Sequence, residues 1–417
     1  MNAALMIPPP EQLPAIRVSG GCFLRTYRNL DSLESLRSDW DALLKRYSLA
    51  TTFSTWEWLS CWWRAFGEGR SLLALALFDR DDCLVALASF SISQEIFSGV
   101  RARVLRLMGD GTYDSDNLDM PVVAGFEDTF ARAIVDYLSN QKAQWDFWQL
   151  NTLPPESPMA ACLSHVTRSR SWISIENATR ACAIHLPSTW NEYLSMLSSE
   201  DGKNLPRYTR RLNAKYRTRI YRCDSISDLP GCLEALFLLH QGRWESVGER
   251  GSFSSVQRRN FYFELSAELL RQRRLELWVL EVNQEIVAVQ FAFRFGDRVF
   301  QLQEGYDHRR SSDRFGYVLR GEVLRVLIQE GATVYDFLAG EDSYKTRWAA
   351  RAGSYRSLRL APRFSKGGLL LQISNRVAIG KQWLRRVLPE GAWSALRRIR
   401  ASVHRDITSR CFFVRRG

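Results

Sequence analysis

The sequence predicts an α/β (α+β) fold with two tandem domains, each built on a mixed central sheet flanked by helices. The chain has 417 residues, two to three times the usual length of one domain. Hydrophobic residues make up 46% and charged residues 24%, which is typical of a globular protein and unlike a disordered one. Strand and helix patterns also follow one another in the same order in the two halves, as expected of central sheets covered by helices.

The composition divides the chain into four parts. A Pro-rich start predicts a flexible arm over residues 1–21. The first domain is expected over 22–180 and the second over 181–362, followed by a basic, amphipathic and helical tail over 363–417.

In the first half, residues 31–46 have the apolar spacing of an amphipathic helix, with Asp31 as the expected N-cap and Glu34 completing a capping box. A second helix is expected over 55–67, where Gly67 ends it. The remaining predicted elements of this half are strands over 71–79 and 83–92, two short strands around a Gly, Asp and Asn loop within 103–123, a helix over 127–139 and a strand over 145–150.

The second half repeats this order. Its predicted elements are a hairpin over 273–295 with its turn at Asn283 and Gln284, a strand over 296–307, a helix over 316–330 and a strand over 333–340. Related tripeptides, WDF at 145–147 and YDF at 335–337, each follow a helix. Two copies of one order indicate a duplicated domain, because a repeat array needs at least three units.

The sequence predicts a cytoplasmic protein that binds no metal. The eight cysteines form no CxxC pair and no Cys/His cluster at the spacing of metal ligands, so neither a disulfide scaffold nor a zinc site is expected. No apolar stretch reaches the roughly 18 to 20 residues that span a bilayer. The N-terminus, MNAALMIPPP, lacks the basic start of a secretory signal.

Positive charge is concentrated in the tail. Of the net charge of +12, residues 361–417 contribute 13 Lys and Arg against two acidic residues. Within the tail, 376–388 and 391–407 place apolar residues on one helical stripe and most arginines off it. This pattern is typical of a helix that lies on an anionic membrane, here the inner membrane face, and docking of the same stripe on the protein is the alternative.

A second basic segment lies between the halves. Residues 203–222 contain eight Lys and Arg and no acidic residue, and the segment predicts a helix whose apolar face is formed by Leu205, Tyr208, Leu212 and Tyr216. The charged face is either solvated or an electrostatic patch for an anionic substrate or cofactor.

Several segments, taken in order, resemble the CelD/BioF-like acetyltransferase family. This family is a branch of the GNAT superfamily and is related to the FemAB-type peptidyltransferases. The resemblance covers about residues 25 to 360 and is carried by TFSTWEWLSCWWRAFG (52–67), GDGTYDSDNLDMPVV (109–123), RYTRRLNAKY (207–216), LLHQGRWESVGERGSF (238–253), EGYDHRRSSDRFGYVL (304–319) and YDFLAGEDSYKTRW (335–348).

The resemblance implies two tandem GNAT-like domains with the acyl donor on the second and the acceptor in the cleft between them. It implies transfer of an acyl group, usually acetyl, from acyl-CoA to an amine or hydroxyl of a sugar or peptide-like precursor. Relatives are associated with envelope or exopolysaccharide synthesis. Two alternatives stay open: a FemAB-like aminoacyltransferase that uses charged tRNA, and a non-catalytic scaffold in a polysaccharide-synthesis complex. No other nucleic acid is expected as a partner.

The resemblance places the donor pyrophosphate at the start of the helix in 311–324, where backbone amides and the helix dipole favour an anion. The residues expected to bind the cofactor are Arg314, Phe315, Gly316 and Tyr317. The usual GNAT fingerprint, Q/R-x-x-G-x-G/A, is not kept, because only one residue separates Arg314 from Gly316 and Val318 takes the final position.

Transfer to an amine requires a base, because a free amine has a pKa of about 10. The candidate catalytic residues are Glu341, Asp336, Tyr344 and His240. Glu341 follows a strand end, and Tyr344 is expected to donate its hydroxyl to the leaving thiolate. Asp336 lies within an apolar strand, where it is either functional or, like its counterpart Asp146, paired with an arginine.

Five further residues are expected to bind substrate: Arg243, Trp244, Glu304, Tyr306 and Lys345. His240, Arg243 and Trp244 share one face of a helix, and the resemblance places this face beside the cleft; plain packing is the alternative. Lys345 is expected to hold a phosphate or a substrate carboxylate, with packing of its short helix over the sheet as the alternative.

Overall fold

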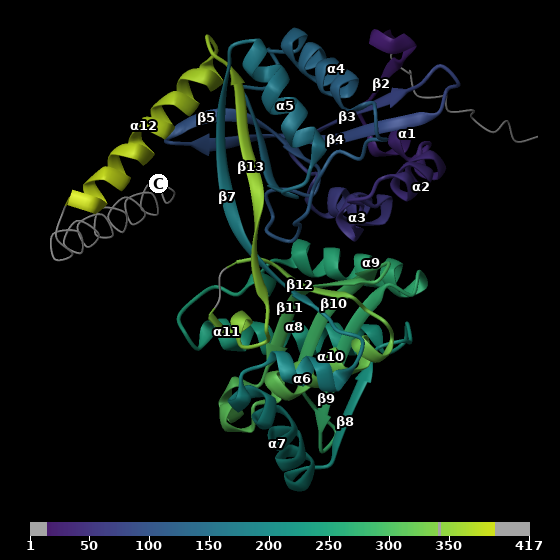
Figure 1. Ribbon diagram of the computed structural model, residues 1–417, viewed down its shortest axis with the longest axis vertical. Helices are drawn as coiled ribbons and strands as arrows, with labels where there is room; N and C mark the ends of the chain where they lie inside the picture. Colours follow the sequence, from purple (N-terminus) through teal and green to yellow (C-terminus); the bar gives the residue numbers. More distant parts are fainter. Residues whose placement is uncertain (1–14, 341–342, 388–417) are drawn as a thin grey trace, which may run out of the picture.

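The computed structural model describes residues 15–340 and 343–387 and has two lobes joined by long strands (Figure 1). The strands are β1 (Ile16–Arg17), β2 (Phe23–Tyr27), β3 (Ser71–Phe78), β4 (Leu84–Phe97), β5 (Val100–Leu107), β6 (Phe147–Leu153), β7 (Trp172–His185), β8 (Thr218–Arg222), β9 (Leu275–Val282), β10 (Glu285–Phe295), β11 (Arg298–Tyr306), β12 (Val334–Ala339) and β13 (Arg351–Pro362).

The α-helices are α1 (Leu30–Glu34), α2 (Arg37–Arg46), α3 (Trp56–Phe66), α4 (Glu127–Asn140), α5 (Pro158–Ser169), α6 (Trp190–Met196), α7 (Ser199–Lys215), α8 (Leu229–Glu245), α9 (Val256–Arg271), α10 (Phe315–Gln329), α11 (Ser343–Thr346) and α12 (Lys366–Val387). The short 3-10 helices are η1 (Ser19–Gly21), η2 (Thr52–Ser54), η3 (Ser252–Ser254) and η4 (His308–Asp313).

The two halves repeat one topology, which confirms the predicted duplication. In the first half, antiparallel strands β3, β4 and β5 are followed by α4 and then by β6, which runs parallel to β5. In the second half, β9, β10, β11, α10 and β12 follow the same plan. β11 and β12 pair only from Arg298–Val334 to Phe300–Asp336, and β5 and β6 likewise pair at three positions. Beyond these pairs the parallel strands part.

The last strand of each half is exchanged with the other half. β7 follows the first half but pairs with β12, whereas β13 follows the second half but pairs with β6. β7 and β13 also pair with each other along the whole of β13, and they are the long ribbons between the lobes in Figure 1. One thirteen-stranded sheet, rather than two separate sheets, therefore runs through the protein, and the predicted boundary at 180/181 falls inside β7.

The helix predicted over residues 31–46 is in fact two helices. Asn29, rather than Asp31, is the N-cap of α1, because its side chain accepts a hydrogen bond from the Ser32 amide at 2.8 Å. Leu36 has ψ of 0°, outside helical geometry, and interrupts the helix. This turn allows Leu36 to lie in the core. The predicted helix ending at Gly67 is confirmed as α3.

Two other segments differ from their predictions. Within the predicted flexible arm over 1–21, β1 pairs with β2, so the sheet already begins at Ile16; residues 1–14 lie outside the described residues. The predicted basic helix over 203–222 ends at Lys215, after which β8 forms the edge of the sheet beside β9.

Only part of the tail lies within the described residues. α12 contains the beginning of the predicted tail, whereas residues 388–417, with the stripe predicted over 391–407, lie outside them. Within the described ranges, no helix is long and apolar enough to cross a membrane, and no group of His, Cys, Asp and Glu is arranged to hold a metal ion. Five of the seven described cysteines are buried free thiols, but Cys83 is exposed before β4.

The core joins the two halves. The Trp58 ring is fully buried in α3 and meets the rings of Phe261 and Phe293, both from the second half, at centroid distances of 5.6 and 5.0 Å. Aromatic contacts of this kind add to the stability gained by burial. The tryptophan-rich helix α3 therefore helps to hold the lobes in a fixed arrangement.

Candidate functional site

A cavity of about 290 Å³ lies in the second half where β11 and β12 part, beside the beginning of α10. Eight of the predicted site residues line it: Arg243, Glu304, Tyr306, Arg314, Phe315, Gly316, Tyr317 and Tyr344. We call this cavity the donor cavity. The sequence places these residues on three separate segments, and the fold brings them together.

The turn into α10 has the backbone expected of an anion-binding turn. Arg314 is in the left-handed region with φ of 57° and precedes the helix without a side-chain cap, so the first helical amides have no side-chain partner at this position. A Cβ at Gly316 would lie 3.0 Å from the Tyr306 ring, so glycine permits this close approach. The exposed Arg314 side chain forms no ion pair with any described residue.

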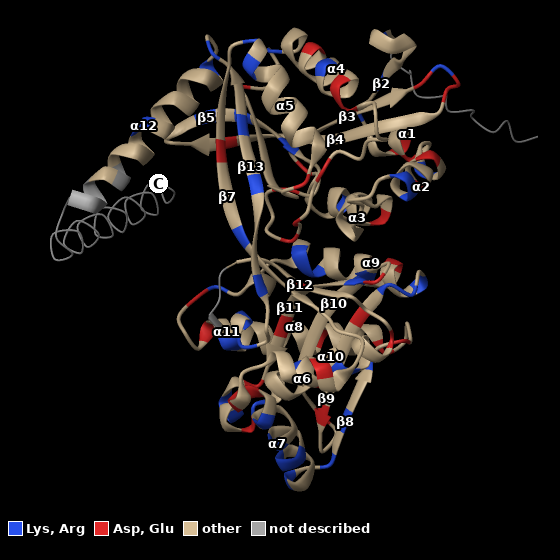
Figure 2. Cartoon of the chain, viewed as in Figure 1, with Lys and Arg blue, Asp and Glu red and all other residues tan. Residues whose placement is uncertain are grey.

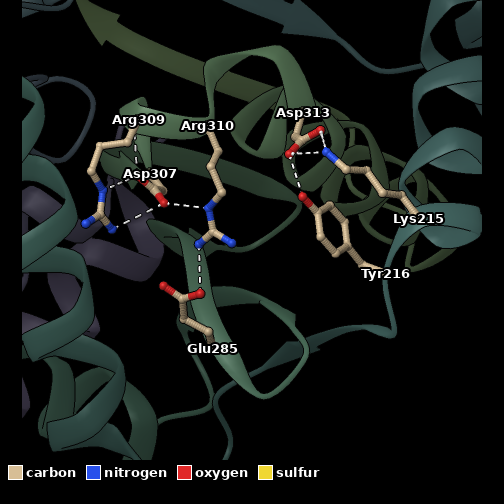
Figure 3. A network of polar contacts seen from close by, with 7 residues as sticks. All are labelled: Lys215, Tyr216, Glu285, Asp307, Arg309, Arg310 and Asp313. Carbon is tan, nitrogen blue, oxygen red and sulfur yellow. Dashed lines mark hydrogen bonds and ion pairs between the residues drawn. The ribbon is translucent and has the colours of Figure 1, made fainter.

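The loop before α10 is fixed by a network of ion pairs (Figure 3). Arg309 and Arg310 both donate to Asp307, at 2.9 and 2.7 Å, and Arg310 also reaches Glu285 at 2.8 Å. Burial would raise the pKa of Asp307, but the hydrogen bonds from the two arginines outweigh it and lower this pKa to about 2. The acidic group beside the turn is therefore neutralised within the loop.

The basic helix α7 forms the other side of this turn. Lys215 and Tyr216 bind the Asp313 carboxylate at 2.7 and 2.8 Å (Figure 3), and the Tyr208 ring meets the Tyr317 ring edge-on. Figure 2 shows Lys and Arg gathered on α7. Since α7 packs against α10, its positive charge lies next to the donor cavity. This position favours the interpretation of the basic segment as an electrostatic patch for an anion over its interpretation as a solvated helix face.

A buried ion pair forms the inner wall of the cavity. Arg320 of α10 is only 4% exposed and donates to Glu304 of β11. The guanidinium also lies 5.2 Å from the Tyr344 ring centroid and 5.4 Å from that of Trp348. Burial lowers the pKa of Arg320, but Glu304 and the neighbouring phenols outweigh this effect, so the net pKa is raised and Arg320 keeps its charge.

Arg320 was not among the predicted site residues. A lone arginine in the apolar stretch of a helix can indicate a buried ion pair, because a buried charge needs a partner. Arg347 and Trp348 also line the cavity without having been predicted, and Arg347 is held by Asp201 at 2.8 Å. The Asp201 partner is far away in sequence, so no local pattern could have indicated it.

Other predicted residues lie apart from the donor cavity. His240 is buried and its Nε2 accepts a hydrogen bond from Trp244 at 3.0 Å. Burial, with Arg243 and Arg258 nearby, lowers the pKa of His240 to about 4, so its imidazole is neutral at pH 7. Of this helix face, only Arg243 lines the cavity, and its guanidinium lies 5.2 Å from the Tyr306 ring centroid.

Asp336 and Lys345 both have partners within the protein. Asp336 accepts from the Leu338 amide at 2.8 Å and lies 3.7 Å from Arg298, on a different cavity; its counterpart Asp146 pairs with Arg103. Lys345 is 4% exposed and donates to the carbonyls at the end of β12, including Gly340 at 3.0 Å. Glu341 lies outside the described residues.

A larger cavity, of about 900 Å³, lies against the first half. Its lining comes mainly from β4, β5, β6 and the loop after β5, with Ala339 and Gly340 at the end of β12. We call it the first-half cavity. The loop of Gly, Asp and Asn was expected from the sequence, but no functional role was predicted for it.

Comparison with known proteins agrees with this architecture. Residues 201–346 match the acetyltransferase (GNAT) domain family. The crystal structure of FemX is similar with a TM-score of 0.56 at 11% identity, over 81% of this chain and 98% of that chain. A conserved protein of unknown function from Bacteroides thetaiotaomicron VPI-5482 is similar with a TM-score of 0.52 at 16% identity, over 78% and 97%. No curated protein sequence matches the chain. The structural likenesses show a shared fold.

Proposed function

Because the chain carries an acyltransferase domain of the GNAT superfamily at residues 201–346, we propose that it transfers an acyl group, most simply acetyl, from acyl-CoA to an amine or hydroxyl of a sugar or peptide-like precursor. The observation that carries the proposal is the donor cavity at the parting of β11 and β12, which ends at the uncapped beginning of α10. An envelope or exopolysaccharide precursor is the proposed acceptor.

The donor's phosphates are proposed to bind at the α10 turn. Helix amides and the helix dipole attract an anion there. Arg314 supplies a positive charge that no described residue neutralises, and α7 adds the positive field of its basic face. When bound, acyl-CoA supplies the thioester that the acceptor attacks.

Two groups in the donor cavity suit the chemistry at the thioester. Tyr344 lies on the cavity wall beside Arg320, where its hydroxyl can protonate the leaving thiolate. The fixed positive charge of Arg320 favours the negative charge that develops during transfer. Glu341 and Asp336 remain candidate bases from the sequence, the first outside the described residues and the second on another cavity.

We further propose that the basic tail, residues 376–407, rests on an anionic membrane surface. Helix α12 begins before this tail and runs into it, and it carries an exposed apolar series: Leu369, Ile373, Val377, Ile379 and Trp383. Exposed apolar side chains with surrounding positive charge fit a lipid surface better than open solvent.

Calorimetric titration of the protein with acetyl-CoA, a longer acyl-CoA and CoA tests the donor site. We expect saturable micromolar binding that Arg314→Gln weakens at least tenfold, since that variant removes one phosphate contact. Arg325→Gln is the matched control, because Arg325 lies on the same helix three turns further along and pairs with Glu322. Absence of heat with every thioester would overturn the CoA-dependent function and favour the tRNA-dependent or scaffold alternative.

A further inference from the structure

The first-half cavity has no part in the proposed donor site, yet it is about three times as large, at about 900 Å³ against about 290 Å³. Most of its lining side chains are hydroxyls, amides, carboxylates and guanidiniums. These side chains can donate hydrogen bonds to a bound ligand and accept hydrogen bonds from it. The cavity therefore suits a ligand rich in hydrogen-bonding groups.

The polar groups on one wall are fixed in place before any ligand arrives. Arg106 donates to Glu95 at 2.9 Å and to Asp110 at 3.2 Å, and Asn151 donates to Asp110 at 2.9 Å. Planar carboxylate, amide and guanidinium groups held in this way can each bind two neighbouring hydroxyls. At the rim, Tyr113 is 96% exposed with φ of 64°, a ring available to cover the apolar face of a sugar.

The charge of the lining favours an amine over an anion. Four acidic residues line the cavity against two basic ones: Glu68, Glu95, Asp110 and Asp116 against Arg70 and Arg106. Arg106 is shared between two of these carboxylates. The excess of negative charge attracts a ligand that carries an ammonium group in solution.

Asp116 lies where the cavity meets the second half. Its carboxylate accepts a hydrogen bond from the Ala339 amide, at the end of β12, at 2.9 Å. Part of its surface opens into the cavity, while surrounding protein atoms enclose the rest. No Lys or Arg among the described residues forms an ion pair with Asp116. Burial raises its pKa to about 6, which leaves the carboxylate ionised at neutral pH but able to take a proton.

The first-half cavity and the donor cavity are lined in part by residues that are close together in the sequence. Ala339 and Gly340 line the first-half cavity, whereas Tyr344 lines the donor cavity. Lys345, next to Tyr344, donates a hydrogen bond to the Gly340 carbonyl at 3.0 Å. Asp116 contacts Ala339, which lies five residues before Tyr344 of the donor cavity in the sequence.

We infer that the first-half cavity is the acceptor site, that its ligand is a hydroxyl-bearing amine of the amino-sugar class, and that Asp116 accepts the proton of the attacking nitrogen. This inference rests on the proposed acyltransferase function and names its acceptor. The bound ammonium group first loses a proton to solvent. The uncharged amine nitrogen then attacks the thioester carbon and forms the C–N bond, which makes the nitrogen cationic and acidic. Asp116 takes one proton from it. The C–S bond then breaks, the amide is released, and the CoA thiolate takes a proton from Tyr344. Tyr344 regains a proton from solvent, and Asp116 releases its proton to solvent.

The test combines acceptor binding with turnover, and uses glucosamine, glucose and no sugar as the three conditions. Ligand-observed NMR should show glucosamine bound to the wild type and bound more weakly to Ser357→Phe, because Ser357 lines the cavity and a phenyl ring there fills it. Thiol release from acetyl-CoA should depend on glucosamine and should fall by about 100-fold or more in Asp116→Asn, the usual loss for a general base.

Asp119→Asn is the matched control. Asp119 lies in the same loop and its pKa is also raised to about 6 by burial, but its carboxylate faces Tyr47 and Ser157 rather than the cavity. The inference is overturned if the wild type binds no glucosamine, if Ser357→Phe binds it equally well, or if Asp116→Asn turns it over like Asp119→Asn. Titration with acetyl-CoA on the same samples separates the two proposals. Absence of acetyl-CoA binding contradicts the proposed acyltransferase function, whereas glucosamine binding tests the first-half cavity independently of the donor.

Discussion

Arg320 and Glu304 show how a single residue pair can shape a site. Both side chains lie on the inner wall of the donor cavity, and Arg320 is surrounded by the rings of Phe337, Tyr344 and Trp348. Loss of one partner from such a pair leaves an unpaired charge that is largely removed from water. The pair therefore holds the cavity wall in place, because separating the two side chains is unfavourable in free energy.

We expect Arg320→Leu to lower the free energy of unfolding by about 3 to 5 kcal/mol, the usual cost of an uncompensated buried charge. The double variant Arg320→Leu with Glu304→Leu should lose less than the single one, since no charge is then stranded. Urea unfolding measures both. Arg325→Leu, which breaks the exposed pair with Glu322, should cost no more than about 1 kcal/mol. An equally small loss in Arg320→Leu would contradict the buried role.

Asp119 should make stability depend on pH. Burial raises its pKa to about 6 in the folded protein, from an ordinary value of 3.8. Between these values the folded protein holds a proton that the unfolded chain lacks, so the free energy of unfolding contributed by this group falls as pH rises from about 4 to about 6. Asp119→Asn removes this group. The free energy of unfolding of the variant should therefore fall by roughly 3 kcal/mol less than that of the wild type over this pH range, at about 1.4 kcal/mol per pKa unit. Urea unfolding across this range measures the difference from wild type, and parallel curves would disprove it.

At the residue scale, sequence patterns could group candidate site residues that are neighbours in the chain. Arg314, Phe315, Gly316 and Tyr317 form one turn, so a local pattern could indicate them, and all four line one cavity. No local pattern could indicate Asp116 as a candidate, because its hydrogen-bond partner Ala339 is 223 residues away. Sites formed by residues that are distant in the sequence cannot be predicted from the spacing of residues within one segment.

At the scale of elements, apolar runs predicted most strands and apolar periodicity predicted most helices, because both patterns follow burial. β3 is buried at every position but its first, and β9 is buried apart from one intermediate position, as expected for strands covered on both faces. The breaks were harder to predict. The kink at Leu36 and the end of α7 at Lys215 depend on which side chains the core accepts, and the local pattern is nearly the same on both sides of each break.

The attachment of α12 to the sheet depends on Gly367. A Cβ at this position would overlap the backbone carbonyl of Asp146, just before β6, whereas a Cβ at Gly380 meets nothing within 4 Å. We expect Gly367→Ala to lower the free energy of unfolding by about 1 to 3 kcal/mol, because backbone cannot move aside as a side chain can. Gly380→Ala should be neutral or stabilising by up to about 1 kcal/mol through helix propensity. Thermal or urea unfolding compares them, and equal behaviour would show that α12 is not held there.

At the scale of the whole molecule, the exchange of β7 and β13 makes the halves inseparable. Each half completes its sheet with a strand from the other, and the Trp58 contacts with Phe261 and Phe293 close the core across the join. The duplicated order could be predicted from the sequence, but the exchange could not, since β7 and β13 would satisfy the same local pattern in either sheet. The rigid join fixes the first-half cavity beside the end of β12, where donor and acceptor are proposed to meet.

The exposed face of α12 leads to a prediction for the whole chain. We expect sedimentation with vesicles to show binding to anionic lipid and little to zwitterionic lipid, with binding weakened by salt, because each Lys or Arg near the surface contributes about 1 kcal/mol. Val377→Asp should weaken binding, because Val377 is 49% exposed on α12, and a carboxylate there opposes both insertion and the lipid charge. Val256→Asp is the control, at a valine 70% exposed on α9. Equal loss in both variants, or none in Val377→Asp, would favour docking of this face on protein.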